Sequence, residues 1–203
     1  NLGEPTGTLP DGRLSYYADP YALSGRRAND NGDFNDIHYL TNASDGITKR
    51  ATFSLELPQS EHWHAKASYT FTDASAVSNG SSSTAGSNWG YNPTINPNEP
   101  LVGTSAFEIE NSFSMSLNYQ NMFFGDTITN IGLVWISQDG EPFSYRYSND
   151  VNGDGRNTND LVYVPMPDEY VMEDPADQAA FEAHLAATGL DQYRGRIAPK
   201  NGF

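Results

Sequence analysis

The chain has 203 residues, and its 26 acidic and 11 basic residues give a formal net charge of −15. Nucleic-acid binding depends on Lys and Arg that neutralise phosphates, so this charge opposes a nucleic-acid partner and suits divalent cations. Cysteine is absent, which excludes a disulfide framework. No run of about 18 apolar residues is present, so the sequence contains no candidate membrane-spanning helix, whereas membrane-spanning β-strands barely register in hydropathy.

Residues 1–47 predict an irregular, loop-rich segment. Pro5, Pro10, Gly12 and Pro20 punctuate it, and these residue types interrupt regular elements. Residues 29–36 read Asn-Asp-Asn-Gly-Asp-Phe-Asn-Asp. Two interpretations of this stretch stay open: a second cation site, or a surface turn of the kind that Asn and Asp commonly form.

Residues 48–147 predict a set of antiparallel strands. Apolar and polar residues alternate with period 2 in 48–58 and again in 63–73, which indicates strands with one apolar and one polar face. Only residues 59–62 separate the two runs, a hairpin-length connection. The apolar positions are Ala51, Phe53, Leu55 and Leu57 in the first run, and Trp63, Ala65, Ala67, Tyr69 and Phe71 in the second.

A long loop rich in Ser, Gly and Asn follows at 74–105, and it predicts no packed core of its own. Two further alternating runs, 107–119 and 127–138, flank a short turn at Gly125 and Asp126. Residues 143–147 add a strand-like stretch. The connections therefore alternate between short turns and very long polar loops.

Residues 148–203 predict an acidic loop, one short helix and an incomplete C-terminal segment. The helix is expected over 174–188. Asp174 is a good N-cap, Pro175 suits the first helical position, and Gly189 suits the C-terminal stop.

The acidic loop, residues 150–160, reads Asp-Val-Asn-Gly-Asp-Gly-Arg-Asn-Thr-Asn-Asp. Oxygen-bearing side chains at its positions 1, 3 and 5, followed by glycine at 6, match the spacing with which a loop encircles calcium. Position 12, where an EF-hand has a bidentate acid, is Leu161, so the loop is nearer to dockerin-type or thrombospondin-type calcium loops. An unliganded acidic turn remains the alternative. The predicted calcium ligands are Asp150, Asn152, Asp154, the Arg156 carbonyl, Thr158 and Asp160.

Other side chains give weaker signals. His62 and His64 have the spacing of a strand-borne zinc pair, but a third ligand is not evident, and polar surface residues are the simpler interpretation. Trp89, Tyr91, Tyr16 and Tyr17 are candidates for stacking on a glycan or peptide, or for anchoring loops. Nucleophile-elbow, phosphate-loop and HExxH motifs are missing, so we predict no catalytic residues and no enzyme activity.

The alternation of short turns with long loops between strands of about 10–12 residues is typical of outer-membrane β-barrels. Particular residues also resemble a known family, the TonB-dependent outer-membrane receptors, in the C-terminal barrel region of the Oar-like group. They are Gly140-Glu-Pro-Phe-Ser-Tyr-Arg-Tyr147, the acidic loop with the following Leu161-Val-Tyr-Val-Pro165, Ala67-Ser-Tyr-Thr-Phe-Thr72, and Tyr193-Arg-Gly-Arg196 with Asn201. The resemblance covers about residues 48–203.

The resemblance implies an all-β fold that forms part of a receptor and transporter barrel in the outer membrane of a Gram-negative bacterium. Calcium would stabilise an extracellular loop, and lipids, a plug domain and TonB would be the partners of the parent protein. Five or six strands are fewer than the ~8 of the smallest barrel and the 22 of the family's transporters, so an incomplete barrel in a receptor fragment is expected. The alternative is a processed fragment that self-assembles through sheet edges into an extracellular filament or tube.

Overall fold

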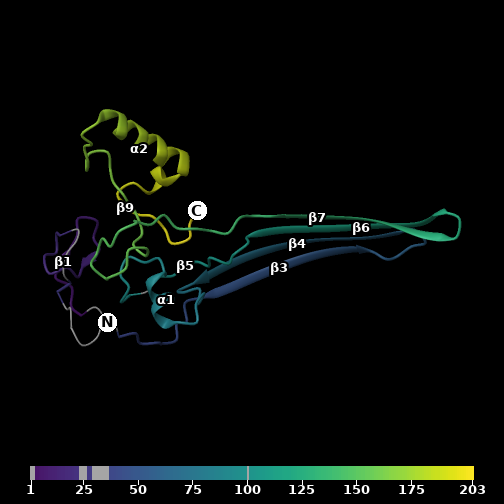
Figure 1. The fold of residues 1–203 in the computed structure, drawn as a ribbon, viewed down its shortest axis with the longest axis horizontal. Coiled ribbons are helices and arrows are strands. Elements are labelled where there is room, and N and C mark those ends of the chain that lie inside the picture. Colours follow the sequence, from purple (N-terminus) through teal and green to yellow (C-terminus); the bar gives the residue numbers. More distant parts are fainter. Residues whose placement is uncertain (1–2, 23–26, 29–36, 100) are drawn as a thin grey trace.

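The computed structural model describes residues 3–22, 27, 28, 37–99 and 101–203, and it is mostly β-structure in antiparallel sheets (Figure 1). This composition is compatible with the predicted all-β class. Residues 29–36, the second cation site considered above, lie outside the described residues. In chain order, the elements are β1 (Gly7–Thr8), β2 (Leu14–Ser15), β3 (Ile47–Leu57), β4 (Trp63–Ala76), α1 (Ala85–Gly90), β5 (Gly103–Thr104), β6 (Asn111–Phe124), β7 (Thr127–Gln138), β8 (Tyr163–Val164), α2 (Pro175–Thr188), the 3-10 helix η1 (Leu190–Tyr193) and β9 (Arg196–Ile197).

Four strands of 11 to 14 residues form the main sheet in the order β3-β4-β6-β7, and β5 pairs with the end of β4. The register places alternating positions of all four strands in rows. One row joins Leu55, Ala67, Met115 and Trp135, and the next row towards β3's start joins Phe53, Tyr69, Phe113 and Ser137. The single row between them joins Ser54, Ser68, Ser114 and Ile136. Because side chains alternate across a strand, one face of the sheet is apolar and the other is mainly polar.

The apolar face of this sheet is open to the surroundings. Phe53 is 70% exposed, Leu55 is 79% exposed and Trp135 is 58% exposed. Within the described residues, no second layer covers these side chains, so this sheet has no two-layer core of the kind that stabilises soluble sandwiches.

The connections divide between the two ends of the sheet. Residues 58–62 and the turn after Phe124 close two hairpins at one end, whereas the long segments lie at the other end (Figure 1). We call these gathered segments, residues 3–22, 77–110 and 139–203, the loop domain. Its apolar core consists of Val164, Leu185, Leu190 and Ala198, against which Tyr145, Phe181, Tyr193 and Phe203 pack.

Several predicted elements differ from the observed ones. β4 continues to Ala76, and the predicted loop 74–105 contains α1 and β5. The third long strand begins at Asn111 instead of residue 107, because a turn closed by the Glu108 N–H on the Ser105 carbonyl (3.0 Å) precedes it. The predicted strand 143–147 is wrong: there the structure has an isolated bridge between Arg146 and Leu161.

The segment 1–47, predicted to be irregular, contains the small β1-β2 hairpin. The predicted helix is confirmed as α2: the Asp174 carboxylate accepts the Ala176 N–H at 2.8 Å, and Gly189 ends the helix with φ 74°. None of the helices in the described part of the chain has the length and apolar character needed to cross a membrane.

Candidate functional site

The acidic loop, which we call the Asp150 loop (residues 150–160), lies inside the loop domain and connects its three segments. Its carbonyls at Asn152 and Asn159 accept the N–H groups of Tyr16 (2.7 Å) and Thr94 (2.9 Å). The Asp160 carbonyl accepts the N–H of Tyr147 at 2.8 Å. The loop is therefore a junction between segments far apart in the sequence, not a freely protruding turn.

Asp150 organises the start of this loop. One of its carboxylate oxygens accepts the N–H groups of Gly153 (2.6 Å) and Asp154 (3.1 Å), and the other accepts the N–H of Gly155 at 2.8 Å. These bonds wrap the backbone around the carboxylate. An ionised carboxylate offers about four acceptor positions, so Asp150 retains capacity for a further donor or a cation.

Two further carboxylates of the loop are completely buried. Asp154 accepts the Arg156 N–H (2.7 Å) and the Asn159 side-chain amide (2.6 Å). Asp160 accepts the Val151 N–H at 2.9 Å. Each of these acids is thus tied to the loop's own donors.

Arg13, from a distant part of the chain, supplies a buried positive charge to the site. Its guanidinium donates to Asp160 at 3.0 Å, to the Leu161 carbonyl at 2.6 Å and to Asp11 at 2.7 Å. It also lies 5.5 Å from the centre of the Tyr147 ring. The Arg13 side chain is fully buried, as is that of Asp160, so this ion pair is shielded from solvent.

The electrostatics of the loop favour additional positive charge. Burial, together with the neighbouring carboxylates Asp160 and Asp150, raises the pKa of Asp154 to about 7. Burial likewise raises the pKa of Asp160 to about 6, against the opposing effects of the Val151 N–H bond and Arg13. Desolvation of clustered carboxylates disfavours their charged forms, and a bound cation would restore those forms.

The donor chemistry of the loop fits a hard cation, although the side-chain positions do not yet form a coordination shell. The side-chain oxygen of Asn152 accepts the Asp154 N–H at 2.9 Å. The amide oxygen of Asn159 is buried and has no hydrogen-bond partner in the structure. Among the described residues, no three His, Cys, Asp or Glu side chains are grouped so that they could hold a metal ion. Coordination would therefore require the carboxylates to shift towards one another.

Two residues of the predicted site contact groups outside the loop, Arg156 through its side chain and Thr158 through its carbonyl. The Arg156 guanidinium lies 5.5 Å from the centre of the Trp89 ring, and the Thr158 carbonyl accepts the Arg146 guanidinium at 2.7 Å. The spacing of the loop did not mark Asn159, which is position 10 of the loop and whose side-chain amide donates to Asp154. Arg13 was not predicted either, because 147 positions separate it from Asp160 and no local signal connects the two.

The Asp150 loop approaches Tyr17 too closely for any residue larger than glycine at position 153. A Cβ on Gly153 would lie 2.7 Å from the Tyr17 backbone nitrogen and 2.9 Å from its ring, and Gly153 has φ 77°. The Tyr17 hydroxyl donates to the Asp150 carbonyl at 2.9 Å. Burial raises the pKa of Tyr17 to about 12, with the nearby aspartates adding to the effect.

The four loop aromatics have different environments. Tyr16 and Tyr17 are buried and anchor the loop domain, with the Tyr16 hydroxyl donating to Asn96 at 3.0 Å. Trp89 is partly buried and lines a cavity of ≈ 550 Å³, whereas Tyr91 is exposed.

The two histidines of the predicted zinc pair have other partners. The His62 ring forms a 3.0 Å hydrogen bond with the Gln120 carbonyl, and His64 lies 3.4 Å from Glu56. Neither contact involves the other histidine. These contacts favour the interpretation of both histidines as polar surface residues.

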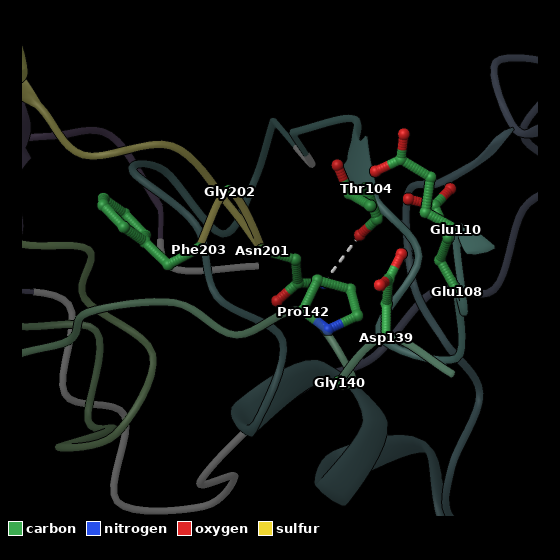
Figure 2. A pocket seen from close by; sticks show the side chains of 9 residues that line it. All are labelled: Thr104, Glu108, Glu110, Asp139, Gly140, Pro142, Asn201, Gly202 and Phe203. Carbon is green, nitrogen blue, oxygen red and sulfur yellow. Dashed lines mark hydrogen bonds between the residues drawn. The ribbon is translucent and has the colours of Figure 1, made fainter. Parts of the chain in front are cut away.

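A second cavity, of ≈ 310 Å³, lies where the main sheet meets the loop domain (Figure 2). Its lining includes the carboxylates of Glu108, Glu110 and Asp139. Glu108 accepts the Ala74 N–H, and Asp139 accepts the backbone and side-chain amides of Asn111 at 2.9 and 2.7 Å. Two of these acids thus complete the hydrogen bonding at strand ends, which is a structural role.

Comparisons of the chain with protein-family models, curated proteins and solved structures give no match.

Proposed function

We propose that this chain is part of the β-barrel of an outer-membrane receptor and transporter of the TonB-dependent kind. In this proposal the main sheet lies in lipid, and the loop domain lies on the extracellular side with calcium bound in the Asp150 loop. Lipids contact the apolar face, and the remainder of the receptor, including a plug and TonB, belongs to the parent protein.

The observation that carries the proposal is the two-faced, single-layer sheet. Leu55, Ala67, Met115 and Trp135 share one face, and that face is uncovered. In water, such a continuous apolar surface would favour aggregation. In a membrane barrel, by contrast, the apolar face contacts lipid and the polar face lines the interior.

The size of the apolar face also suits a bilayer. On β4 it runs from Trp63 to Phe71, which is about 26 Å at a rise of about 3.3 Å per residue. Barrels of this class have an apolar band about 25 Å tall with aromatic residues at both borders. Trp63 packs on Tyr119 at one border, with ring centroids 4.4 Å apart, and Tyr69, Phe71 and Phe113 lie towards the other.

The distribution of connections gives the sheet an orientation. Outer-membrane barrels have short turns on the periplasmic side and long loops outside. Both short connections lie at one end of the main sheet, and the loop domain lies at the other (Figure 1). The proposal therefore places the loop domain, including the Asp150 loop, outside the cell.

Calcium in the Asp150 loop is supported by two independent features. The neighbouring carboxylates Asp160 and Asp150 add to burial in raising the pKa of Asp154, although the buried Arg13 pairs with Asp160 and Arg27 lowers the pKa of Asp150. In addition, the buried amide oxygen of Asn159, whose nitrogen contacts Asp154, has no partner. The candidate ligands are Asp150, Asn152, Asp154, Asn159 and Asp160, which are the oxygen donors that calcium prefers.

Membrane fractionation tests the proposal. Expressed in a Gram-negative host with an export signal, the chain should be found in the outer-membrane fraction, resist extraction by salt or carbonate, and need detergent for solubility. Its band on an unheated gel should shift on boiling, as expected of membrane-embedded β-structure. Recovery of detergent-free, soluble monomers would contradict the proposal.

A second candidate is self-assembly through sheet edges into an extracellular filament or tube. Within the described residues, the outer edges of β3 and β7 pair with no strand, and exposed edges template pairing with other chains. The same fractionation separates the two candidates, because sedimenting polymers that form without detergent favour assembly. Electron microscopy of the sediment would show whether the polymers are ordered.

A further inference from the structure

We propose that the cavity lined by Trp89, which we call the Trp89 cavity, binds a neutral saccharide. The cavity has a volume of ≈ 550 Å³, and ligand pockets typically measure about 300–1,000 Å³. Its lining includes Trp89 of α1 together with residues 37–41, and α1 lies at the end of the main sheet away from the hairpins (Figure 1). This inference goes beyond the proposed function and does not depend on the Asp150 loop.

Aromatic rings form one part of the lining. The His38 and Trp89 rings lie 5.3 Å apart with their planes tilted by 50°. The indole N–H of Trp89 donates to the Pro97 carbonyl at 3.3 Å, which fixes the ring. Tyr39 adds a third ring that is 89% exposed at the surface. Rigid aromatic side chains provide contact area for the C–H faces of a sugar at low cost in side-chain entropy.

Fixed amide groups form the polar part of the lining. The Asn92 side-chain oxygen accepts the Lys200 ammonium at 2.8 Å, so the amide nitrogen of Asn92 keeps its two donors. The Asn98 side-chain nitrogen donates to the Tyr16 hydroxyl at 3.3 Å, so the amide oxygen of Asn98 keeps its acceptor positions. A sugar hydroxyl both donates and accepts, and this pairing of a donor with an acceptor suits it.

The charge of the lining points to a neutral ligand. Among the described residues that line the cavity, there is no Asp, Glu, Lys or Arg, although the whole chain carries 37 such residues, 26 acidic and 11 basic. A charged ligand would lose its hydration without gaining a counter-ion, which is costly. The acidic surface of the chain also opposes an anion.

Two basic side chains contact residues of the lining: Arg156, whose guanidinium lies 5.5 Å from the centre of the Trp89 ring, and Lys200, which donates to Asn92. Lys200 is 3% exposed, and its ammonium donates to the Val77 carbonyl (2.5 Å), to Asn92 (2.8 Å) and to the Leu101 carbonyl (3.2 Å). An ammonium has three donors, and these three bonds use all of them. Lys200 therefore holds two lining residues in place and does not act as an anion receptor.

The test uses the whole chain purified in a detergent without a sugar headgroup, because a maltoside or glucoside would compete for the cavity. A glycan array with neutral glucans, xylans, mannans and N-acetylglucosamine oligomers, together with sulfated and uronate glycans, identifies the class. Calorimetry then measures the affinity of the best neutral oligosaccharide. The expected result is binding with a Kd tighter than about 1 mM and no comparable binding of acidic glycans.

Three variants locate the binding. Trp89→Ala should weaken binding about tenfold by removing the fixed ring. Asn92→Asp keeps an acceptor for Lys200 but removes the amide donor, and it should weaken binding about fivefold. Tyr91→Ala is the matched aromatic control, since Tyr91 is exposed and outside the lining, and it should change the Kd by less than about twofold.

The proposal is overturned if no neutral glycan binds, if acidic glycans bind as tightly, or if Asn92→Asp binds like the parent chain. Circular dichroism of each variant verifies its fold. If Trp89→Ala does not fold, the comparison of Asn92→Asp with Tyr91→Ala decides. Failure of membrane localisation would leave this result intact, so the two proposals fail separately.

Discussion

Replacing Leu55 with lysine tests whether the apolar face of the main sheet contacts lipid. Leu55 is 79% exposed, and its row of the register lies midway between the row of Phe71 and that of Trp63. In a barrel, lysine at the bilayer midplane costs about 2–4 kcal/mol, which is about thirty-fold to several-hundredfold in the folding equilibrium. In water, the same exposed substitution would change the stability by less than about 0.5 kcal/mol.

Ser54→Lys provides the matched control. Ser54 is the preceding residue of β3, is also exposed, and lies on the opposite, mainly polar face. Substitutions that face a barrel interior avoid the cost of burying a charge in lipid. The two variants add the same side chain to the same strand, so strand propensity and net charge are nearly equal between them.

The assay is folding into phosphatidylcholine vesicles from urea, followed by tryptophan fluorescence and by the mobility shift of unheated samples. Leu55→Lys should lower the folded fraction and shift the urea midpoint down, while Ser54→Lys should stay near the parent chain. Equal behaviour of the two variants would refute the lipid-facing assignment. A Leu55→Lys variant that becomes soluble and monomeric without detergent would refute it as well.

Three other predictions follow from the loop domain. Calcium at about a hundred times its Kd should stabilise the chain by about 2.7 kcal/mol. The stabilisation is measured as a rise in Tm that a chelator reverses. Asp154→Asn should abolish that rise if the Asp150 loop is the site. Gly153→Ala should lower the Tm more than Gly12→Ala, because both have positive φ but only at Gly153 would the new Cβ meet the backbone of Tyr17; equal losses would show that the close approach is unimportant. Burial lowers the pKa of Lys200 to about 8, so between pH 8 and about 10.4 the unfolded chain holds more protons than the folded one and stability should rise with pH. A pH scan of the Tm of the parent chain, minus that of Lys200→Gln, isolates this effect, and a difference that falls over this range would contradict it.

The local elements were predictable because their signals are short-range. Alternating residues on 48–58, 63–73 and 127–138 predicted strands that the structure contains, and the Asp174 cap with Gly189 predicted α2. At 143–147, strand propensity alone predicted a strand that the structure does not contain. These residues have strand propensity, but backbone pairing needs a partner strand, and the structure provides one bridge, from Arg146 to Leu161.

The candidate metal site was predictable in part. The spacing of Asp150, Asn152, Asp154 and Asp160 marked the loop, and the structure places Asp154 and Asp160 in complete burial. Thr158 was predicted as a ligand, whereas it is Asn159 that contacts Asp154. Position counting within a loop cannot distinguish neighbouring residues whose side chains point in different directions.

The sequence by itself determined the residues of each strand face, the helix and the chemistry of the acidic loop, since these depend on neighbours a few positions apart. Only the tertiary structure decided that the Asp150 loop is a buried junction, that Arg13 pairs with Asp160, and that Trp89 lines a cavity while Tyr16 and Tyr17 anchor loops. Burial and charge pairing depend on contacts between segments more than a hundred residues apart, such as Arg13 with Asp160. Such contacts form only when the chain folds, and they leave no periodic trace in the sequence.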